Sequence, residues 1–385
     1  MNSNNESNTI SNEVALYIHI PFCKQKCLYC DFPSFCGKEG HMLEYSRALA
    51  KDIEGIGNRK IKTIFIGGGT PTYLSLEGWN IIKSAIDKLN KREDLEFTVE
   101  GNPGTFTEEK LLFLKRMGVN RLSIGLQAWQ DSILNKLGRI HSVGEFIESY
   151  HLARKVGFNN INADLMFGLP NQSLKDWEET LINITKLNPE HISCYSLIVE
   201  ENTPFYKMYE DEKLQLPEEE IERKMYNLAV EILKKEGYER YEISNFSKTG
   251  KECKHNLVYW DLDEYVGCGV GSHSYVDGIR YRKTENIEEY IEEMTLGNDL
   301  RLDIHENSLK DDMEEFMFMG LRKIDGISVD KFNIRFKKDI YLVYGDIIEK
   351  YLSEGMLIKS GERLFLSNRA IEVSNSIMCD FILSE

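Results

Sequence analysis

Residues 21–30 of this chain read Pro21-Phe22-Cys23-Lys24-Gln25-Lys26-Cys27-Leu28-Tyr29-Cys30 and directly follow an apolar, strand-like run at residues 15–20. The loop therefore carries three cysteines at C-x3-C-x2-C spacing. Three thiolates from one loop can hold three irons of a four-iron cube, and no fourth cysteine follows at ferredoxin spacing. We expect Cys23, Cys27 and Cys30 to hold a 4Fe–4S cluster with one open iron.

Two other interpretations of the cysteine loop are a zinc site and three reduced thiols. A closed zinc site needs four ligands in paired spacing, and no such second pair appears downstream in the sequence. Reduced thiolates and the lack of a secretory apolar segment predict a cytoplasmic protein. No apolar stretch approaches 18 residues, so we expect no transmembrane segment, which leaves peripheral membrane contact open.

Length and charge narrow the classes of function. The chain has 385 residues, of which 42% are hydrophobic, so it can bury a large core and divide into a main domain and smaller units. Its formal net charge of -16 argues against nucleic acid as a partner, because phosphate backbones are bound by clustered Lys and Arg. Residues 1–12, rich in Asn and Ser, are expected to form a disordered tail.

Residues 13–205 alternate short apolar runs with helical patterns. This βα rhythm predicts a parallel sheet of the α/β class. Strands are expected at residues 15–20, 63–66, 96–99, 121–125, 161–166 and 191–197. Leu174, Trp177, Leu181, Ile184 and Leu187 recur at helical spacing and mark a covering helix. Six βα units predict an incomplete (β/α)6 barrel, with sites at the C-terminal ends of its strands.

The rhythm changes after residue 205. Residues 206–300 predict an α+β extension that opens with a helix after Pro217, and residues 301–385 predict helices followed by a hairpin around Gly361. That order is winged-helix-like. The last segment holds 12 Lys and Arg against 16 Asp and Glu, which favours a packing or partner module over DNA binding.

Several predicted strand ends carry groups suited to a small ligand. Gly67-Gly68-Gly69-Thr70-Pro71 follows the second strand, where a backbone without side chains can approach a ligand closely. Polar side chains lie at or just after the ends of the next three strands, and a barrel would turn them toward one mouth. They are Glu100, Gln127, Arg139 and Asp164.

The cysteine loop, with Tyr29 before its last cysteine, resembles that of the radical S-adenosylmethionine (SAM) superfamily. This implies that the open iron binds SAM and can cleave it reductively. The strings at residues 121–127 and 164–170 are similar to those of the oxygen-independent coproporphyrinogen III oxidases and their relatives. Within that branch the resemblance implies SAM contacts by Tyr17, Gly69, Thr70, Glu100, Gln127, Arg139 and Asp164.

Two features separate the members of that branch. The oxidases carry a fourth cysteine two residues after the third, where this chain has Phe32, and they have a longer segment before the cluster than the 22 residues here. Cys36 lies four residues further on. His255-Asn256-Leu257-Val258-Tyr259-Trp260 matches the haem-binding motif of the HemW-type haem chaperones, which share the Cys-Asp-Phe ending of the cluster loop. The resemblance implies haem as a third cofactor, with His255 as its axial ligand.

We expect a haem chaperone that passes haem to recipient haemoproteins not identified by the sequence. The alternatives are an oxygen-independent coproporphyrinogen III oxidase and, more distantly, a radical methylase or other porphyrin-modifying enzyme. His255 lies far along the chain from the cysteine loop and is expected to lie outside the barrel. Cys253 is a candidate for a covalent haem link, and His273 for a second iron ligand, although residue type alone fits ordinary packing equally well.

Overall fold

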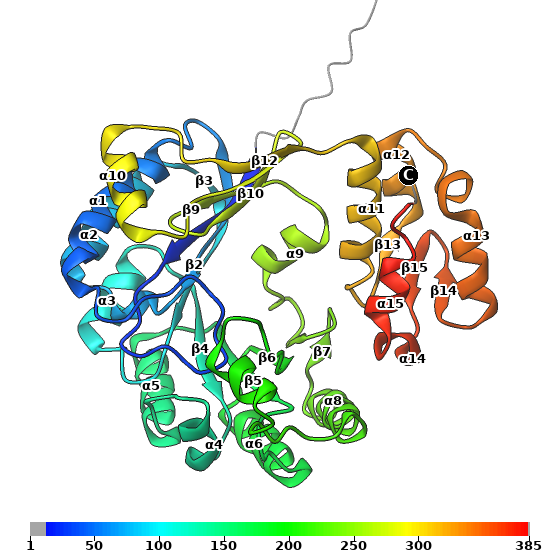
Figure 1. Ribbon diagram of the computed structural model, residues 1–385, viewed down its shortest axis with the longest axis horizontal. Helices are drawn as coiled ribbons and strands as arrows, with labels where there is room; N and C mark the ends of the chain where they lie inside the picture. The colour runs from blue at the N-terminus through cyan, green and yellow to red at the C-terminus, as the bar shows by residue number, and fades with distance from the viewer. Residues whose placement is uncertain (1–12, 384–385) are drawn as a thin grey trace, which may run out of the picture.

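The computed structural model describes residues 13–383, so the predicted tail at residues 1–12 lies outside the described residues. Six parallel neighbouring strands curve around a central space, with helices on the outside (Figure 1). This confirms the predicted barrel, and its strands are β1 (Glu13–Ile20), β2 (Lys60–Gly68), β3 (Asn90–Gly101), β4 (Arg121–Gln127), β5 (Ile161–Phe167) and β6 (His191–Ser196).

Local sequence signals set the limits of the covering helices. Helices α5 and α6 each begin at a capping box, formed by Ser142 with Glu145 and by Ser173 with Asp176. The first six helices and two 3-10 turns are η1 (Glu39–His41), α1 (Met42–Glu54), η2 (Pro71–Tyr73), α2 (Leu76–Asp87), α3 (Glu108–Arg116), α4 (Asp131–Lys136), α5 (Val143–Val156) and α6 (Leu174–Leu187).

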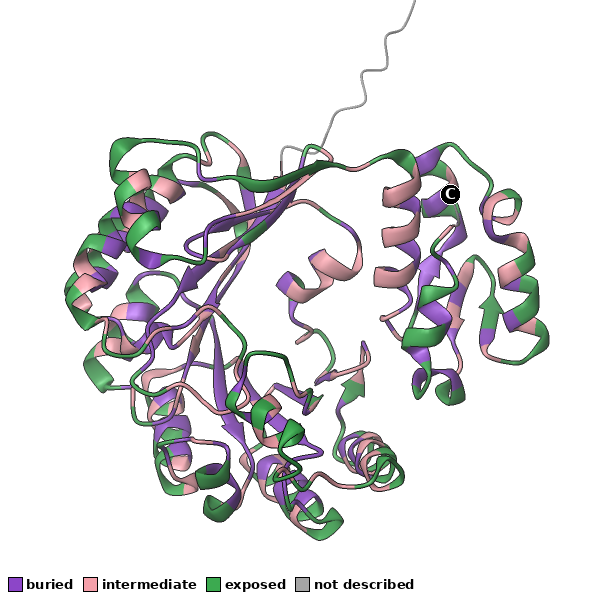
Figure 2. Cartoon of the chain, viewed as in Figure 1, coloured by how far each residue is buried: buried purple, intermediate pink, exposed green. Residues whose placement is uncertain are grey.

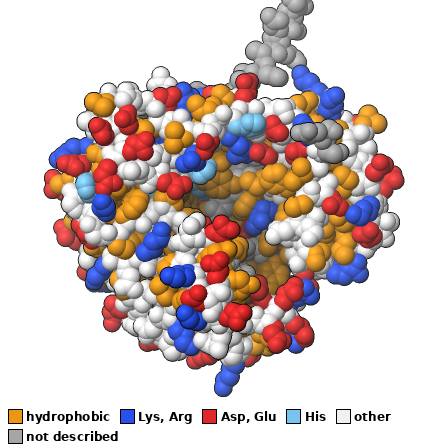
Figure 3. Space-filling view, in the orientation of Figure 1, with side chains coloured by type: hydrophobic (Ala, Val, Ile, Leu, Met, Phe, Trp, Pro, Cys, Tyr) orange, Lys and Arg blue, Asp and Glu red, His pale blue; other side chains and the backbone are white. Residues whose placement is uncertain are grey.

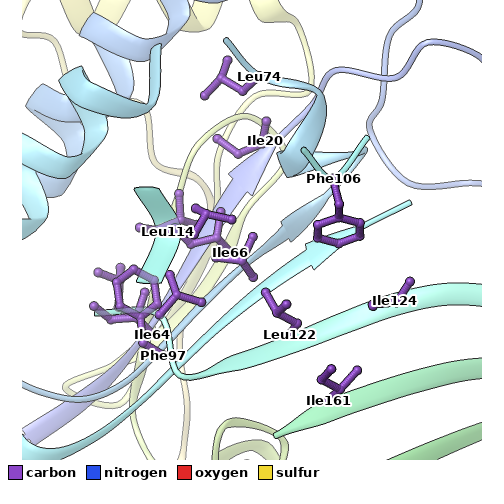
Figure 4. Packing of buried hydrophobic residues seen from close by; sticks show 14 of the residues in the cluster. Ile20, Ile64, Ile66, Leu74, Phe97, Phe106, Leu114, Leu122, Ile124 and Ile161 are labelled. Carbon is purple, nitrogen blue, oxygen red and sulfur yellow. The ribbon is translucent and has the colours of Figure 1, made fainter. Parts of the chain in front are cut away.

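The main core lies between the strands and these helices. Alternate residues of a strand face opposite sides of the sheet, so Ile64 and Ile66 of β2 pack outward with Phe97 and Leu114 (Figure 4). The strands are buried along most of their length (Figure 2). The opposite, inward faces of the strands carry the polar and charged side chains described below.

Residues 206–300, together with β12 just beyond them, extend the same sheet at both edges. On one side β9 pairs in parallel with β1, and on the other β8 pairs antiparallel with β6, which gives one 12-stranded sheet. The elements after β6 are α7 (Pro204–Glu210), α8 (Glu219–Lys235), β7 (Glu239–Arg240), β8 (Asn245–Ser247), α9 (Lys254–Trp260), β9 (Tyr265–Cys268), β10 (His273–Val276), β11 (Ile279–Arg282), α10 (Ile287–Leu296) and β12 (Leu302–Glu306).

The C-terminal module has its own hydrophobic core and a three-stranded sheet in the order β13-β15-β14. Three of its helices precede the hairpin, as the winged-helix-like prediction expects, and two shorter helices follow it. Its elements are α11 (Leu309–Gly320), β13 (Ile327–Ser328), α12 (Val329–Phe336), α13 (Ile340–Ser353), β14 (Leu357–Ser360), β15 (Arg363–Leu366), α14 (Asn368–Ile371) and α15 (Ser374–Cys379). Among residues 13–383, no helix is both long and apolar enough to cross a lipid bilayer.

Candidate functional site

The cysteine loop is closed by a short bridge between Phe22 and Phe35. The Cys23 amide donates to the carbonyl of Phe35 at 3.0 Å, and the Phe35 amide donates to Pro21 at 2.7 Å. Cys23 is buried, whereas Cys27 and Cys30 are partly exposed. The loop therefore begins in the protein and presents its later cysteines toward the strand ends.

The glycine loop after β2 packs directly on the cysteine loop. The amide of Thr70 donates to the Phe22 carbonyl at 2.9 Å. A Cβ atom added to Gly69 would lie 2.9 Å from that carbonyl oxygen and 3.0 Å from the sulfur of Cys23. No side chain fits there, so the structure explains why this position is glycine.

The loop chemistry fits a cluster. Burial raises the pKa of the Cys23 thiol to about 11. A cluster ligand must be a thiolate, so the free energy of the iron–sulfur bond has to offset the cost of removing this proton. Within residues 13–383, no group of three or more His, Cys, Asp or Glu side chains is arranged to hold a single metal ion. In a four-iron cube each thiolate instead binds a different iron, and one loop supplies all three.

The inward faces of β1, β3 and β5 carry Tyr17, Glu100 and Asp164, which remain partly exposed. We call this polar region of the barrel interior the lumen. Desolvation by the surrounding protein and then the charge of Asp164 raise the pKa of Glu100 to about 8. Asp164 is held by Ser123, whose hydroxyl donates to the carboxylate at 2.9 Å. The lumen thus holds two coupled carboxyl groups, of which Glu100 is protonated near neutral pH.

Gln127 and Arg139 meet beside the cysteine loop. A Cβ on Gly125 would lie within about 3 Å of Gln127, Arg139 and Asn102, so these three side chains surround one point. Arg139 donates to the carbonyl of Gly125 at 2.7 Å, to Asn102 at 2.8 Å and to the Cys27 sulfur at 3.5 Å. Gln127 has a φ of 73°, a left-handed conformation that non-glycine residues seldom adopt and that is often found at functional sites.

The structure brings the predicted SAM residues to one mouth in two groups. One group lies at the cysteine loop and contains Gly69, Thr70 and Arg139, with Gln127 beside Arg139; the other lines the lumen and contains Tyr17, Glu100 and Asp164. Thr70 joins the first group because its hydroxyl lies 3.6 Å from the Cys23 sulfur.

Asn102 and His19 were missed by the sequence analysis. Asn102 donates to the hydroxyl of Thr70 at 2.8 Å, and His19 contacts the Tyr17 hydroxyl at 2.9 Å and the Pro33 carbonyl at 2.7 Å. Asn102 follows the third strand by one residue, and His19 shares the inward face of β1 with Tyr17. Strand alternation and strand-end position could have found both.

The prediction that His255 lies outside the barrel was wrong. Helix α9 closes the lower end of the barrel interior, where His255 is 1% exposed and stacks on Phe65 of β2. The amides of Lys254 and His255 donate to the carboxylate of Glu96 on β3, at 3.1 and 3.0 Å. An acidic side chain is favourable at a helix N-terminus, so β3 draws the start of α9 inside the barrel.

Both imidazole nitrogens of His255 have partners. Nδ1 lies 2.9 Å from the hydroxyl of Thr63, and Nε2 lies 2.9 Å from the hydroxyl of Tyr259. Burial, with Arg121 and Lys62 contributing, lowers the pKa of His255 to about 3, so the ring is neutral. The imidazole is therefore neutral, as a metal-binding imidazole must be, and hydroxyl groups lie at both of its nitrogens.

Of the remaining candidate residues, one is buried and the others are exposed at the surface. Cys253 is fully buried, and its thiol donates to Glu96 at 3.6 Å. His273 is an exposed residue of β10, paired with Arg282 of β11. Phe32 is 59% exposed at the edge of the cysteine loop, and Cys36 is exposed as well.

Comparison with known proteins places the chain in a family. Residues 17–182 match the radical SAM superfamily, and residues 307–373 match the HemN C-terminal domain. The haem chaperone HemW of Bacillus subtilis is 39% identical over 372 residues, covering 95% of this chain and 98% of that protein. This chain belongs to the HemW family. HemW of Escherichia coli is 38% identical over 71% of this chain and 73% of its own.

The HemW family lies within the radical SAM superfamily, which implies a 4Fe–4S cluster and SAM as cofactors. The coproporphyrinogen III oxidase HemN of Escherichia coli has the same fold, with a TM-score of 0.84 over 96% of this chain and 90% of that one. Its sequence identity is only 18%, so the likeness concerns the fold alone.

Proposed function

We propose that this protein binds haem and transfers it to recipient haemoproteins. The observation that carries this proposal is the 39% identity to a haem chaperone over almost the whole of both chains. The presence of His255, Tyr259 and Trp260 together on α9 supports it. We also propose a cytoplasmic location, because none of the eight cysteines, which all lie within residues 13–383, forms a disulfide.

Cys23, Cys27 and Cys30 are the proposed cluster ligands. A cluster with one open iron binds SAM and can cleave it reductively. Thr70, Gln127 and Arg139, together with Asn102, lie against the cysteines and supply donors and acceptors for a polar ligand there. Tyr17, Glu100 and Asp164 would hold the part of SAM that extends into the lumen, and Gly69 permits close approach.

His255 is the proposed haem ligand. A metal-binding histidine usually has its other ring nitrogen fixed by a hydrogen bond, and Thr63 provides this at Nδ1. Nε2 would then bind iron after the hydroxyl of Tyr259 has moved away. Because His255 is neutral above about pH 3, iron does not compete with a proton at neutral pH.

The proposal is tested by incubating the anaerobically reconstituted protein with haem and an apo-haemoprotein, and separately with coproporphyrinogen III. We expect haem to appear in the acceptor and no protoporphyrinogen to form. Conversion of coproporphyrinogen III to protoporphyrinogen would show that the protein is an oxidase rather than a haem chaperone.

A variant tests the ligand. His255→Ala should alter the Soret spectrum more than the amount of haem bound, because Tyr259 and Trp260 still contact the porphyrin. Cluster iron should stay unchanged. An unchanged Soret spectrum would remove His255 as the ligand.

A further inference from the structure

A cavity of about 320 Å³ lies between the end of α9 and the C-terminal module. An adjoining cavity of about 380 Å³ shares Asp261, Lys323, Lys331 and Arg363 with it. Both volumes fall within the range of about 300 to 1,000 Å³ that is typical of ligand sites. Figure 3 shows the molecule hollowed near its centre, with hydrophobic side chains beside the hollow toward the C-terminal module. Neither cavity belongs to the cysteine loop or the lumen.

The first cavity combines apolar side chains with excess positive charge. Trp260, Phe316 and Ile334 contribute apolar surface, and Ile334 is 77% exposed. The guanidinium of Arg322 lies over one face of the Trp260 ring, 4.6 Å from its centroid. A planar aromatic ligand in the cavity would stack on the other face of the indole.

Four cations and two carboxylates line the same cavity. Asp261 is paired with Lys323, and Asp263 with Lys62 at 2.6 Å, while Arg363 pairs with Asp325 at 2.5 Å.

Two cations have no carboxylate partner within residues 13–383. Lys331 makes no side-chain ion pair there, and Arg335 donates only to backbone carbonyls, including Leu262 at 2.9 Å. The whole chain carries a net charge of -16, whereas this pocket holds two positive charges that no carboxylate within residues 13–383 pairs with. It is complementary to a ligand with two carboxylates.

We propose that this cavity is a docking site for a porphyrin dicarboxylate, with Lys331 and Arg335 pairing with its two propionates and Trp260 packing on its ring. The inference rests on the proposed haem-binding function and adds the surface that receives haem. Trp260 and His255 lie on the same helix but at opposite ends, so docking here requires no bond to iron.

The experiment therefore uses protoporphyrin IX, which has both propionates and no iron, and measures quenching of tryptophan fluorescence. The wild-type protein should bind it, and Trp260→Phe should lose most of the quenching. Lys331→Gln with Arg335→Gln should weaken binding by about three- to tenfold, as expected for two partly exposed ion pairs. Lys331→Gln alone should give a smaller loss, and Lys338→Gln, an exposed lysine outside the cavity, should give none.

The dimethyl ester of protoporphyrin IX separates charge from shape. It should bind the wild type as weakly as the free acid binds the double variant. Equal affinity of the wild type for acid and ester would overturn the docking site. If haem binds and transfers normally while protoporphyrin IX does not bind, the chaperone function stands and this inference falls. If neither porphyrin binds, both fall.

Discussion

The two ends of the barrel interior differ in packing although both are lined by polar side chains. Toward the C-terminal ends of the strands, Tyr17, Glu100 and Asp164 line the lumen and stay partly exposed. At the N-terminal ends, Glu96, Arg121 and other polar groups are buried beneath α9. In barrels of this kind the first end usually carries chemistry and the second stability. Here the proposed haem motif lies at the second end.

Hydrogen bonds connect the two ends. Asp164 accepts from Asn162 at 2.7 Å, and the oxygen of Asn162 lies 2.6 Å from Nδ1 of His191. His191 in turn contacts Tyr241 at 2.8 Å, whose hydroxyl accepts from the amide of Cys253 at 3.3 Å. A polar path therefore runs from the lumen to the start of α9. The comparison indicates that the motif is held by barrel residues rather than by a separate haem domain.

The largest expected effect tests the open end. Cys23→Ala should remove essentially all cluster iron, because two thiolates leave another iron of the cube uncapped. Cys36→Ala, at an exposed cysteine near the same loop, should retain it. Iron and sulfide analysis of both variants distinguishes them, and equal losses would show that Cys36 is also a ligand.

The second prediction concerns the effect of Glu100 on the pH dependence of stability. The pKa of Glu100 is about 8 in the folded protein against an ordinary 4.5, so the folded protein keeps a proton that the unfolded chain loses between these values. The free energy of unfolding should therefore fall as pH rises from 4.5 to 8. Glu100→Gln should remove this contribution, worth at most about 4 kcal/mol. Denaturant titrations at pH 4.5 and pH 8 measure the free energy of unfolding of the wild type and of Glu100→Gln. If that free energy changes by the same amount between the two pH values in both proteins, the prediction is wrong.

At the end of the barrel closed by α9, a substitution should change the free energy of unfolding at constant pH. Glu96→Gln replaces one carboxylate oxygen facing the amides of Lys254 and His255 by a donor, which should cost about 2 kcal/mol in the free energy of unfolding. Glu93→Gln, at an exposed position of the same strand, should change it by less than about 0.5 kcal/mol. If the two variants unfold alike in denaturant, Glu96 does not anchor α9.

The smallest expected effect sharpens the link between the closed end and haem. Tyr259→Phe removes the hydroxyl that occupies Nε2 of His255, so haem affinity should rise by about fivefold, or about 1 kcal/mol. Tyr281→Phe on β11 is the control. Absorbance titration with haem measures both, and unchanged or weaker binding in Tyr259→Phe would mean that this hydroxyl does not compete with iron.

Much of the fold could be predicted because its signals are local. The βα rhythm predicted all six barrel strands, and the apolar stripe from Leu174 to Leu187 predicted α6 at its observed limits. The hairpin around Gly361 is also present. The shared sheet of residues 13–205 and 206–300 was not predicted, because pairing of β9 with β1 joins residues about 250 positions apart and leaves no local pattern.

The sequence by itself determined which residues can do chemistry: three cysteines in one loop, glycines after one strand, polar groups at the ends of others, and an imidazole four residues before a tyrosine. Only the tertiary structure decided their surroundings. It placed His255 in the lower end of the barrel interior, because Glu96, 159 residues earlier, accepts a hydrogen bond from the amide of His255. It also placed Trp260 against the C-terminal module. Burial and charge depend on neighbours in space, so long-range packing set the pKa of His255 and the positive cavity beyond it.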